Sequence, residues 1–420
     1  MASGDRTPST LAFLEGSRSK IRYDADELRS TDPADGRTLL ARYDVDAARR
    51  GLTKEVVAGR RRGLWRWEEL LPVRKRSFMT TLGEGSTPLL GPARLARKLG
   101  LNGLHIKAES VNPTGSFKAR GMAVAVSRAV ELGATHLVAP SAGNAGGALA
   151  AYAAAAGVPS TVVMPADAPQ VNQQEALACG ARVILLDGLI SDCGRLARFI
   201  CEQTAAFDMA TLREPYRVEG KKTLGFELAE DFGWSLPDAI VYPTGGGTGL
   251  IGMWKAFDEL EALGLIGSAR PRMYAVQSDG CAPIVRAFEQ GAEFAEPWSG
   301  AATRAAGIRV PSALGDHLIL DCLRRSGGGA IAVPETEIEA MQAYAARQGA
   351  GYLCLESCAA LAALPMMRER GLIGADERIA IFDTGAGFKS DARALDRLAV
   401  VPNNPDEWPE VMDRQYHSSR

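Results

Sequence analysis

The chain has 420 residues, of which 46% are hydrophobic and 23% are charged, and its formal net charge at pH 7 is −2. This length suits two globular domains, and the near-neutral charge argues against nucleic acid or an anionic membrane as the main partner. It contains no run of about 18 apolar residues and no signal-peptide pattern at its start. Its seven cysteines are scattered, which is typical of reduced thiols. We therefore expect a cytoplasmic protein without a membrane span.

Residues 1–75 are polar and mixed in character, and we interpret them as an N-terminal extension. Cysteine and histidine are both absent from the sequence before His105, so the side chains that usually bind a structural zinc ion are missing. We therefore expect no metal there. The helical stretch Trp65–Leu71, which includes Trp67, is expected to hold this segment by packing instead.

The segment NPTGSFKARG, residues 112–121, places Lys118 where a turn gives way to a predicted helix. The positive end of the helix macrodipole repels an ammonium group, which lowers the pKa of the lysine and favours the neutral amine that forms a Schiff base. A surface lysine at a helix start explains the same pattern. The segment alone leaves both interpretations open.

From residue 136 onwards, short β-rich runs alternate with longer helical runs. This alternation predicts βαβ units around parallel sheets, with right-handed crossovers that place helices on both faces. The strands are too numerous for one small sheet, so we predict an α/β fold with two doubly wound parallel-sheet domains. The predicted strands are 136–140, 160–165, 182–187, 239–244, 272–278, 330–334 and 378–384.

Three glycine-rich segments follow predicted strands, and ligands of parallel sheets bind at the carboxyl ends of strands. Segment 141–147 leads into an alanine-rich helix whose free N–H groups suit a carboxylate. Segment 244–249 offers successive backbone amides to a phosphate and lacks the Lys-Ser/Thr of a Walker A loop. Segment 384–387 begins with Thr384, whose hydroxyl could reach a ring nitrogen. Ordinary tight turns are the alternative for each.

One lysine, one carboxylate-binding turn, one phosphate-binding loop and one strand-end hydroxyl are enough to hold pyridoxal phosphate and an amino acid. The order and spacing of these motifs resemble the fold-type II pyridoxal-phosphate enzymes, which are tryptophan synthase β-like, and within them the threonine synthase family. The resemblance covers roughly residues 20–395. It is carried by LGEGSTPLL (82–90), ESVNPTGSFKARGM (109–122), REPYRVEGKKTLGFELAE (213–230), YPTGGGTGLIGMWKAF (242–257) and DTGAGFK (383–389).

The resemblance implies pyridoxal 5'-phosphate as cofactor and Lys118 as the catalytic residue that forms the Schiff base and moves protons. Asn144 would bind the 3′-oxygen of the cofactor, and Thr384 would face its pyridine nitrogen. The cofactor phosphate would be held by four consecutive residues, Gly245, Gly246, Gly247 and Thr248.

The resemblance also implies a substrate site. Ser141, Ala142 and Gly143 would hold the substrate carboxylate, and the planar guanidinium of Arg217 would bind a substrate phosphate. Arg304 and Arg309 are either surface charges or further ligands of an anionic side chain. Several positions lack the polar side chain of the family pattern, which leaves the substrate open: they are Ala119, Ala142, Ala145, Leu212 and Ala386.

By the same resemblance, residues 12–45 look like a zinc-ribbon segment that has lost its ligands. Residues 76–115 and 215–400 would form the large cofactor-holding domain, residues 116–214 the small domain, and residues 401–420 a tail.

By analogy with such relatives we expect a homodimer in the cytoplasm. The predicted function is that of a lyase of amino-acid biosynthesis, a threonine synthase that converts O-phospho-L-homoserine and water to L-threonine and phosphate. One alternative is β-replacement or β-elimination on serine, threonine or O-phosphoserine. Another is a non-catalytic binding protein.

Overall fold

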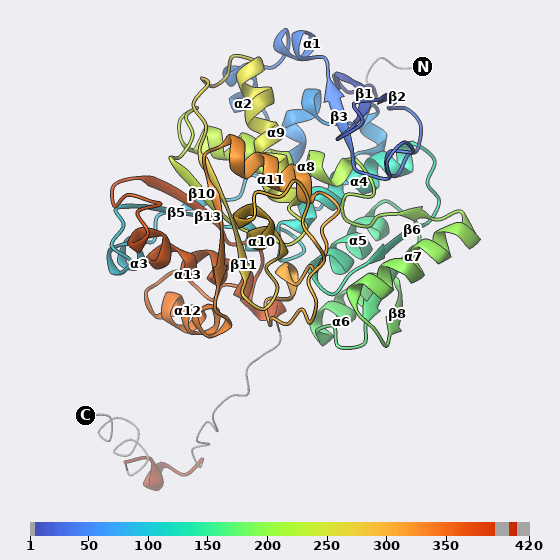
Figure 1. Ribbon diagram of the computed structural model, residues 1–420. Coiled ribbons are helices and arrows are strands. Elements are labelled where there is room, and N and C mark those ends of the chain that lie inside the picture. Colours follow the sequence, from blue (N-terminus) through green and yellow to red (C-terminus); the bar gives the residue numbers. More distant parts are fainter. Residues whose placement is uncertain (1–4, 391–402, 410–420) are drawn as a thin grey trace. The chain divides into compact units, whose positions relative to one another are not determined.

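The computed structural model describes residues 5–390 and 403–409, and Figure 1 shows three sheets among them. The part of the chain that ends at Ser390 forms one unit, and the part from Asp391 onwards forms another. In the second unit the described residues contain the 3-10 turn η6, Pro405–Glu407, and residues 401–402 and 410–420 of the predicted tail lie outside the described residues.

The N-terminal extension contains a small antiparallel sheet with the strand order β2-β1-β3. Leu14 and Ala41 are fully buried and belong to the same hydrophobic cluster as Trp67, so packing holds this sheet. The stretch predicted as helical is a 3-10 helix. The elements are β1 Leu11–Gly16, β2 Arg22–Tyr23, β3 Leu39–Tyr43, α1 Val45–Arg49, α2 Lys54–Gly59, η1 Leu64–Leu70 and η2 Arg76–Phe78.

The largest sheet has six strands in the order β12-β11-β10-β13-β5-β4, and all neighbours are parallel except β4 and β5. Its side chains alternate between two cores: Ile240 and Tyr242 point into one cluster, and Ala239 and Val241 into the other. The sheet is therefore covered on both faces. Its strands are β4 Leu89–Leu90, β5 Gly103–Lys107, β10 Ala239–Pro243, β11 Arg272–Ser278, β12 Gly329–Val333 and β13 Arg378–Phe382.

A second parallel sheet has four strands in the order β8-β7-β6-β9. Val162 packs with Ala176 of α6 on one face, and Val163 packs with Ala197 of α7 on the other. In Figure 1 helices α5, α6 and α7 gather around this sheet. The elements are β6 Leu137–Pro140, β7 Ser160–Pro165, β8 Arg182–Leu186, β9 Phe207–Asp208, α5 Asn144–Ala155, α6 Gln170–Ala178 and α7 Ile190–Thr204.

The remaining helices connect and cover the strands. They are α3 Ala93–Lys98, α4 Lys118–Glu131, α8 Tyr216–Asp231, α9 Thr248–Ala262, α10 Pro283–Glu289, α11 Asp316–Arg325, α12 Glu335–Arg347 and α13 Leu355–Glu369, with the short 3-10 helices η3 Glu109–Val111, η4 Ala306–Ile308 and η5 Gly387–Lys389. Among the described residues, no helix has the length and apolar character needed to cross a membrane.

The predicted α/β fold with parallel sheets is confirmed, and each of the seven strands predicted after residue 136 is found within two residues of its predicted end. The strands β1 to β5 and β9 were not predicted. The domain boundaries stay a prediction.

Candidate active site

A cavity of about 320 Å³ lies where the loops that follow β6, β10 and β13 meet the start of α4. This volume is within the range of about 300–1,000 Å³ that is usual for small-molecule sites. The cavity brings together all the site residues predicted from the sequence. They are Lys118, Ser141, Ala142, Gly143, Asn144, Arg217, Gly245, Gly246, Gly247, Thr248 and Thr384.

The turn before α4 fixes where Lys118 begins the helix. The amide of Phe117 donates to the carbonyl oxygen of Thr384 over 3.0 Å, and the amide of Ala386 donates to the carbonyl oxygen of Gly115 over 2.8 Å. These two hydrogen bonds join the turn that carries Lys118 to the loop that follows β13. The amine and the Thr384 hydroxyl therefore belong to adjoining, mutually anchored segments.

Lys118 has a pKa lowered to about 8. Burial is the main cause, and the positive charge of Arg217 lowers the pKa further, whereas Glu356 opposes the shift. The direction agrees with the prediction, which assigned it to the helix macrodipole, whereas burial and Arg217 account for the lowering here. A lysine with this pKa has a substantial neutral fraction near pH 8, which suits a nucleophile or a base.

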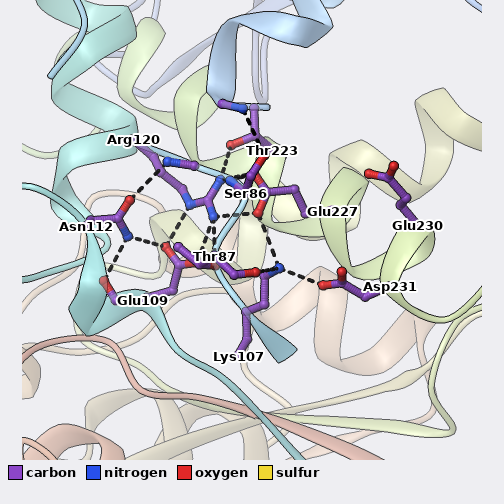
Figure 2. A network of polar contacts seen from close by, with 12 residues as sticks. Ser86, Thr87, Lys107, Glu109, Asn112, Arg120, Thr223, Glu227, Glu230 and Asp231 are labelled. Carbon is purple, nitrogen blue, oxygen red and sulfur yellow. Dashed lines mark hydrogen bonds and ion pairs between the residues drawn. The ribbon is translucent and has the colours of Figure 1, made fainter. Parts of the chain in front are cut away.

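A buried polar network holds α4 in place two residues after Lys118 (Figure 2). The guanidinium of Arg120 donates from Nε to Glu109 Oε2 over 2.7 Å and from Nη1 to Glu227 Oε1 over 2.6 Å. Burial disfavours its charge, but the two carboxylates together raise the pKa of Arg120 well above its usual value. Lys107 of β5 adds an ion pair to Glu227 at 3.3 Å. The network thus ties α4, α8 and β5 together beneath the cavity.

Glycines form the wall between β10 and α9. A Cβ atom at Gly245 would lie 2.6 Å from the carbonyl oxygen of Gly307, and one at Gly246 would lie 2.9 Å from Thr211 Cγ2. Gly247 has a φ of +75°, and a Cβ there would lie 2.3 Å from Ile319 Cδ1. No described residue accepts a hydrogen bond from the amides of these three glycines. Free amides ahead of a helix N-terminus are the arrangement that binds phosphate.

The loop between β6 and α5 is ordered by its own hydroxyl. Ser141 Oγ accepts from the amide of Gly146 over 2.8 Å and donates to the carbonyl oxygen of Gly143 over 2.9 Å. Asn144 opens α5, and its buried Oδ1 receives no hydrogen bond from the described residues. Asn172 of α6 also lines the cavity with a buried, unpartnered Oδ1. These carbonyl oxygens are available to a bound molecule.

Thr384 lies beside neutral groups. Its amide donates to Ser357 Oγ over 2.9 Å, and its hydroxyl is 3.6 Å from the sulfur of Cys354. Burial raises the pKa of the Cys354 thiol well above its usual value, so the thiol stays protonated. A ring nitrogen placed here would meet a hydroxyl and a thiol rather than a carboxylate.

Arg217, in the first turn of α8, has donors that the protein leaves unused. Its Nη1 donates to the carbonyl oxygen of Met209 over 2.9 Å. Its buried Nε has no hydrogen-bond partner among the described residues and lies 4.0 Å from Glu214 Oε1. Burial raises the pKa of Glu214 to about 8, so this carboxyl is largely neutral at pH 7 and does not cancel the arginine's charge. Arg217 can therefore bind an anion in the cavity.

The positions that depart from the family pattern divide into two groups. Ala142 and Ala145 line the cavity, whereas Ala119 and Leu212 do not. Leu212 is buried, and its Cδ1 is 2.4 Å from where a Cβ of Gly315 would stand, so its side chain packs toward α11. Ala386 is also absent from the lining, so of these five positions only Ala142 and Ala145 border the cavity directly.

Sequence reasoning did not select several other lining residues. Of the two arginines left open, Arg309 lines the cavity and lies 3.5 Å from Asp167, while Arg304 pairs with Glu339 away from it. The remaining lining residues with polar side chains are Asn172, Ser191, Thr211, Tyr242, Ser312, Glu356, Lys389 and Ser390. Tyr242 and Lys389 lie within the segments 242–257 and 383–389 that carry the resemblance, and Arg309 lies in a basic run, whereas the other residues of this set gave no signal in the sequence. Among the described residues, no group of His, Cys, Asp or Glu is placed to hold a metal ion.

Comparison with known proteins gives the following matches. Residues 80–385 match the family described as pyridoxal-phosphate dependent enzyme. The threonine synthase of Methanocaldococcus jannaschii is 35% identical over 374 residues, which are 89% of this chain and 92% of that protein. The threonine synthase of Methanosarcina acetivorans is 38% identical, over 83% of this chain and 86% of that protein.

Among solved structures, a threonine deaminase from T.th. is 26% identical with a TM-score of 0.61, over 74% of this chain and 94% of that chain. Maize serine racemase is 21% identical with a TM-score of 0.62, over 80% of this chain and 94% of that chain. At this identity, the likeness to the racemase concerns the fold alone.

Proposed function

The chain belongs to the threonine synthases, within the pyridoxal-phosphate dependent enzymes, and from this premise we propose that the cavity at Lys118 is its active site. The protein is a lyase that converts O-phospho-L-homoserine and water to L-threonine and phosphate. The observation that carries the proposal is the convergence of a lysine of lowered pKa, a loop of free glycine amides and an unshielded arginine on one cavity.

The residues present fit pyridoxal phosphate. The Lys118 amine would form the covalent linkage that holds the cofactor, and residues 245–248 would bind its phosphate with backbone amides. The Thr384 hydroxyl would meet the pyridine nitrogen, and Asn144 would bind the 3′-oxygen. The unpartnered Oδ1 of Asn144 and the unused amides of the glycine loop support this assignment.

When bound, pyridoxal phosphate supplies an electron sink for negative charge at the α carbon of an amino acid. Lys118 is the group that removes the α proton and then moves a proton at the β carbon. Its pKa of about 8 allows both the neutral base and the protonated acid to be populated near neutral pH.

The substrate is held at two ends. Residues 141–143 would bind its carboxylate with the amides at the start of α5, and Arg217 would bind its phosphate. Phosphate leaves the γ carbon and water adds to the β carbon, so the cavity must retain a cation beside the departing anion. Arg217 meets that need because its neighbour Glu214 is largely neutral.

A second candidate is β-replacement or β-elimination on serine, threonine or O-phosphoserine. It is favoured by Ala142 and Ala145, which line the cavity without the hydroxyls that the family pattern places there. The likeness to a threonine deaminase fold is consistent with it. A non-catalytic binding protein is a third candidate, which lacks a specific supporting observation.

Product analysis distinguishes these candidates. The purified protein is supplied with O-phospho-L-homoserine, O-phospho-L-serine, L-serine or L-threonine, and phosphate, threonine and 2-oxo acids are measured. We expect phosphate and threonine in equal amounts from O-phosphohomoserine, and none from the Lys118→Ala variant. Formation of 2-oxo acids alone would favour elimination, and cofactor binding without any product would favour the binding protein.

The finer assignments of assembly and location are also proposed. We infer a homodimer from the resemblance to such enzymes, and light scattering of the purified protein tests it. A cytoplasmic location is supported by the free state of all seven cysteines, which suits a reducing compartment.

A further inference from the structure

Glu356 is the sole carboxylate among the described residues that line the cavity. It lies in the first turn of α13, and its side chain is half-buried. The other charged residues of the lining are cations: Lys118, Arg217, Arg309 and Lys389. One negative charge in such a lining affects every positive group around it, because the interior screens charge poorly.

Glu356 is also attached to the wall that faces the glycine loop. Its Oε1 accepts a hydrogen bond of 2.6 Å from the amide of Gly307. A Cβ at Gly307 would lie 2.8 Å from that oxygen, so the contact requires a residue without a side chain. The carbonyl oxygen of Gly307 in turn occupies the space that a Cβ of Gly245 would need. The carboxylate therefore holds the segment against which the glycine loop packs.

We infer that Glu356 is a positioning residue of the active site, which ties the wall of residues 306–312 to α13 and offsets the positive charge around Lys118. The inference rests on the proposed function, because it takes Lys118 as the reacting amine. A glutamine at this position could keep the hydrogen bond to Gly307 but would lose the charge. The hydrogen bond to Gly307 and the negative charge of Glu356 can therefore be tested separately.

The charges around Lys118 give the direction of the effect. Burial and Arg217 lower the pKa of Lys118, whereas Glu356 and Cys354 raise it. Lys221 of α8 is a further buried amine nearby, which donates to the carbonyl oxygen of Phe117 and has a pKa lowered well below its usual value by burial and by Lys118. Removing the charge of Glu356 should therefore lower the pKa of Lys118 below about 8.

Other groups that face Glu356 do not replace its charge. Cys354 and Cys358 have thiol pKa values raised by burial and by Glu356, so both stay protonated at neutral pH. Burial raises the pKa of Asp383 to about 6, with a contribution from Glu356. Asp383 is thus already mostly ionised at pH 7, and loss of Glu356 adds little negative charge there.

The test compares Glu356→Gln with Glu335→Gln in the full-length chain. Glu335 anchors the residues just before this segment, outside the cavity: its Oε1 accepts from the amide of Arg304 over 2.8 Å, and its Oε2 accepts from the hydroxyl of Thr303 over 2.7 Å. Acetylation of Lys118 by acetic anhydride is followed by peptide mass spectrometry as a function of pH. Protection of the same lysine after loading with pyridoxal phosphate identifies the reacting amine.

We expect the Glu356→Gln curve to move to lower pH by about one unit, which gives roughly tenfold more Lys118 labelling at pH 6. The Glu335→Gln curve should match the unaltered chain, and Glu356→Asp, which keeps the charge, should remain near it. An unmoved Glu356→Gln curve, or an equal shift in Glu335→Gln, would overturn the inference. Because labelling needs no turnover, its outcome is separate from whether O-phosphohomoserine is the substrate.

Discussion

The guanidinium of Arg217 lowers the pKa of Lys118 across the cavity that both side chains line. The carboxyl group beside Arg217 is that of Glu214, whose pKa burial raises to about 8, so it is largely neutral at pH 7. The site therefore concentrates positive charge where a phosphorylated substrate is proposed to bind. The same charge lowers the pKa of Lys118 and so favours its neutral form.

The first prediction concerns pH. The neutral amine of Lys118 is the form that captures pyridoxal phosphate, so the capture rate should rise with pH and level off above about 8. In Arg217→Met the positive charge is removed, the pKa of Lys118 rises, and the plateau should begin at higher pH. Stopped-flow absorbance after mixing with the cofactor measures both curves. A midpoint near the ordinary lysine value of about 10.4 would contradict the role given to burial.

The second prediction concerns Lys118 itself. Lys118→Ala should reduce turnover of O-phosphohomoserine by at least about a hundredfold, because it removes the proposed proton-transfer group. The fold should persist, since Lys118 takes part in no ion pair with the described residues. Circular dichroism and phosphate release measure the two effects. The exposed Lys98 of α3 offers the control Lys98→Ala, which should match the unaltered chain in both.

The third prediction concerns substrate choice. Arg217→Met should lower kcat/KM for O-phosphohomoserine by roughly tenfold to a hundredfold, because a hydrogen bond to a charged group contributes about 1.5–3 kcal/mol. Any reaction with unphosphorylated L-serine should change far less. Arg304→Gln removes a cation that pairs with Glu339 outside the cavity lining. This control should leave kcat/KM for O-phosphohomoserine and any reaction with L-serine unchanged. An equal loss for both amino acids would show that Arg217 acts through structure alone.

The fourth prediction separates backbone strain from crowding in the glycine loop. Gly247 and Gly264 have φ values of +75° and +76°, but only a Cβ at Gly247 meets a neighbour, Ile319 Cδ1 at 2.3 Å. Each alanine variant should lose roughly 1–2 kcal/mol from the left-handed backbone. Gly247→Ala should lose about 1–3 kcal/mol more and bind pyridoxal phosphate weakly. Thermal unfolding and cofactor titration provide the comparison, and equal cofactor affinity in both variants would remove Gly247 from the phosphate site.

The fifth prediction concerns the network of Figure 2. Arg120→Met leaves the buried carboxylates of Glu109 and Glu227 without their main partner, which should destabilise the fold by about 3–5 kcal/mol. Arg195→Gln removes an ion pair whose arginine is 69% exposed and should cost under about 1 kcal/mol. Denaturant unfolding measures the two losses. Similar small losses would mean that Glu109 and Glu227 find other partners.

Several of the strands that the sequence revealed are buried on both faces. Strands 160–165, 239–243 and 272–278 are near-continuous apolar runs, as parallel strands covered by helices require. Strand β5, with the sequence GLHIK, has the same surroundings but was not predicted because it carries His105 and Lys107. Lys107 is tolerated there because Asp231, 124 residues away in the chain, accepts a hydrogen bond from it at 2.6 Å.

In the active site, too, residues that depend on contacts between distant parts of the chain could not be predicted from the sequence. The loops after β6, β10 and β13 could be selected because parallel strands bring their carboxyl ends to one edge, so glycine-rich segments there mark a site. Glu356 and Asn172 could not be selected, because each lies in the first turn of a helix without any distinctive pattern. Only packing of α6 and α13 against the sheets brings them to the cavity. Leu212 shows the same limit, because its neighbour in the chain, Thr211, lines the cavity whereas the side chain of Leu212 lies beside Gly315.

The paired hydrogen bonds between residues 115–117 and residues 384–386 have a mechanical consequence. They join the backbone of the turn that carries Lys118 to the backbone of the loop that carries Thr384, so the spacing of these two segments does not depend on the side chains that line the cavity. A cofactor that contacts both Lys118 and Thr384 would therefore be held between two segments that are joined through their backbones.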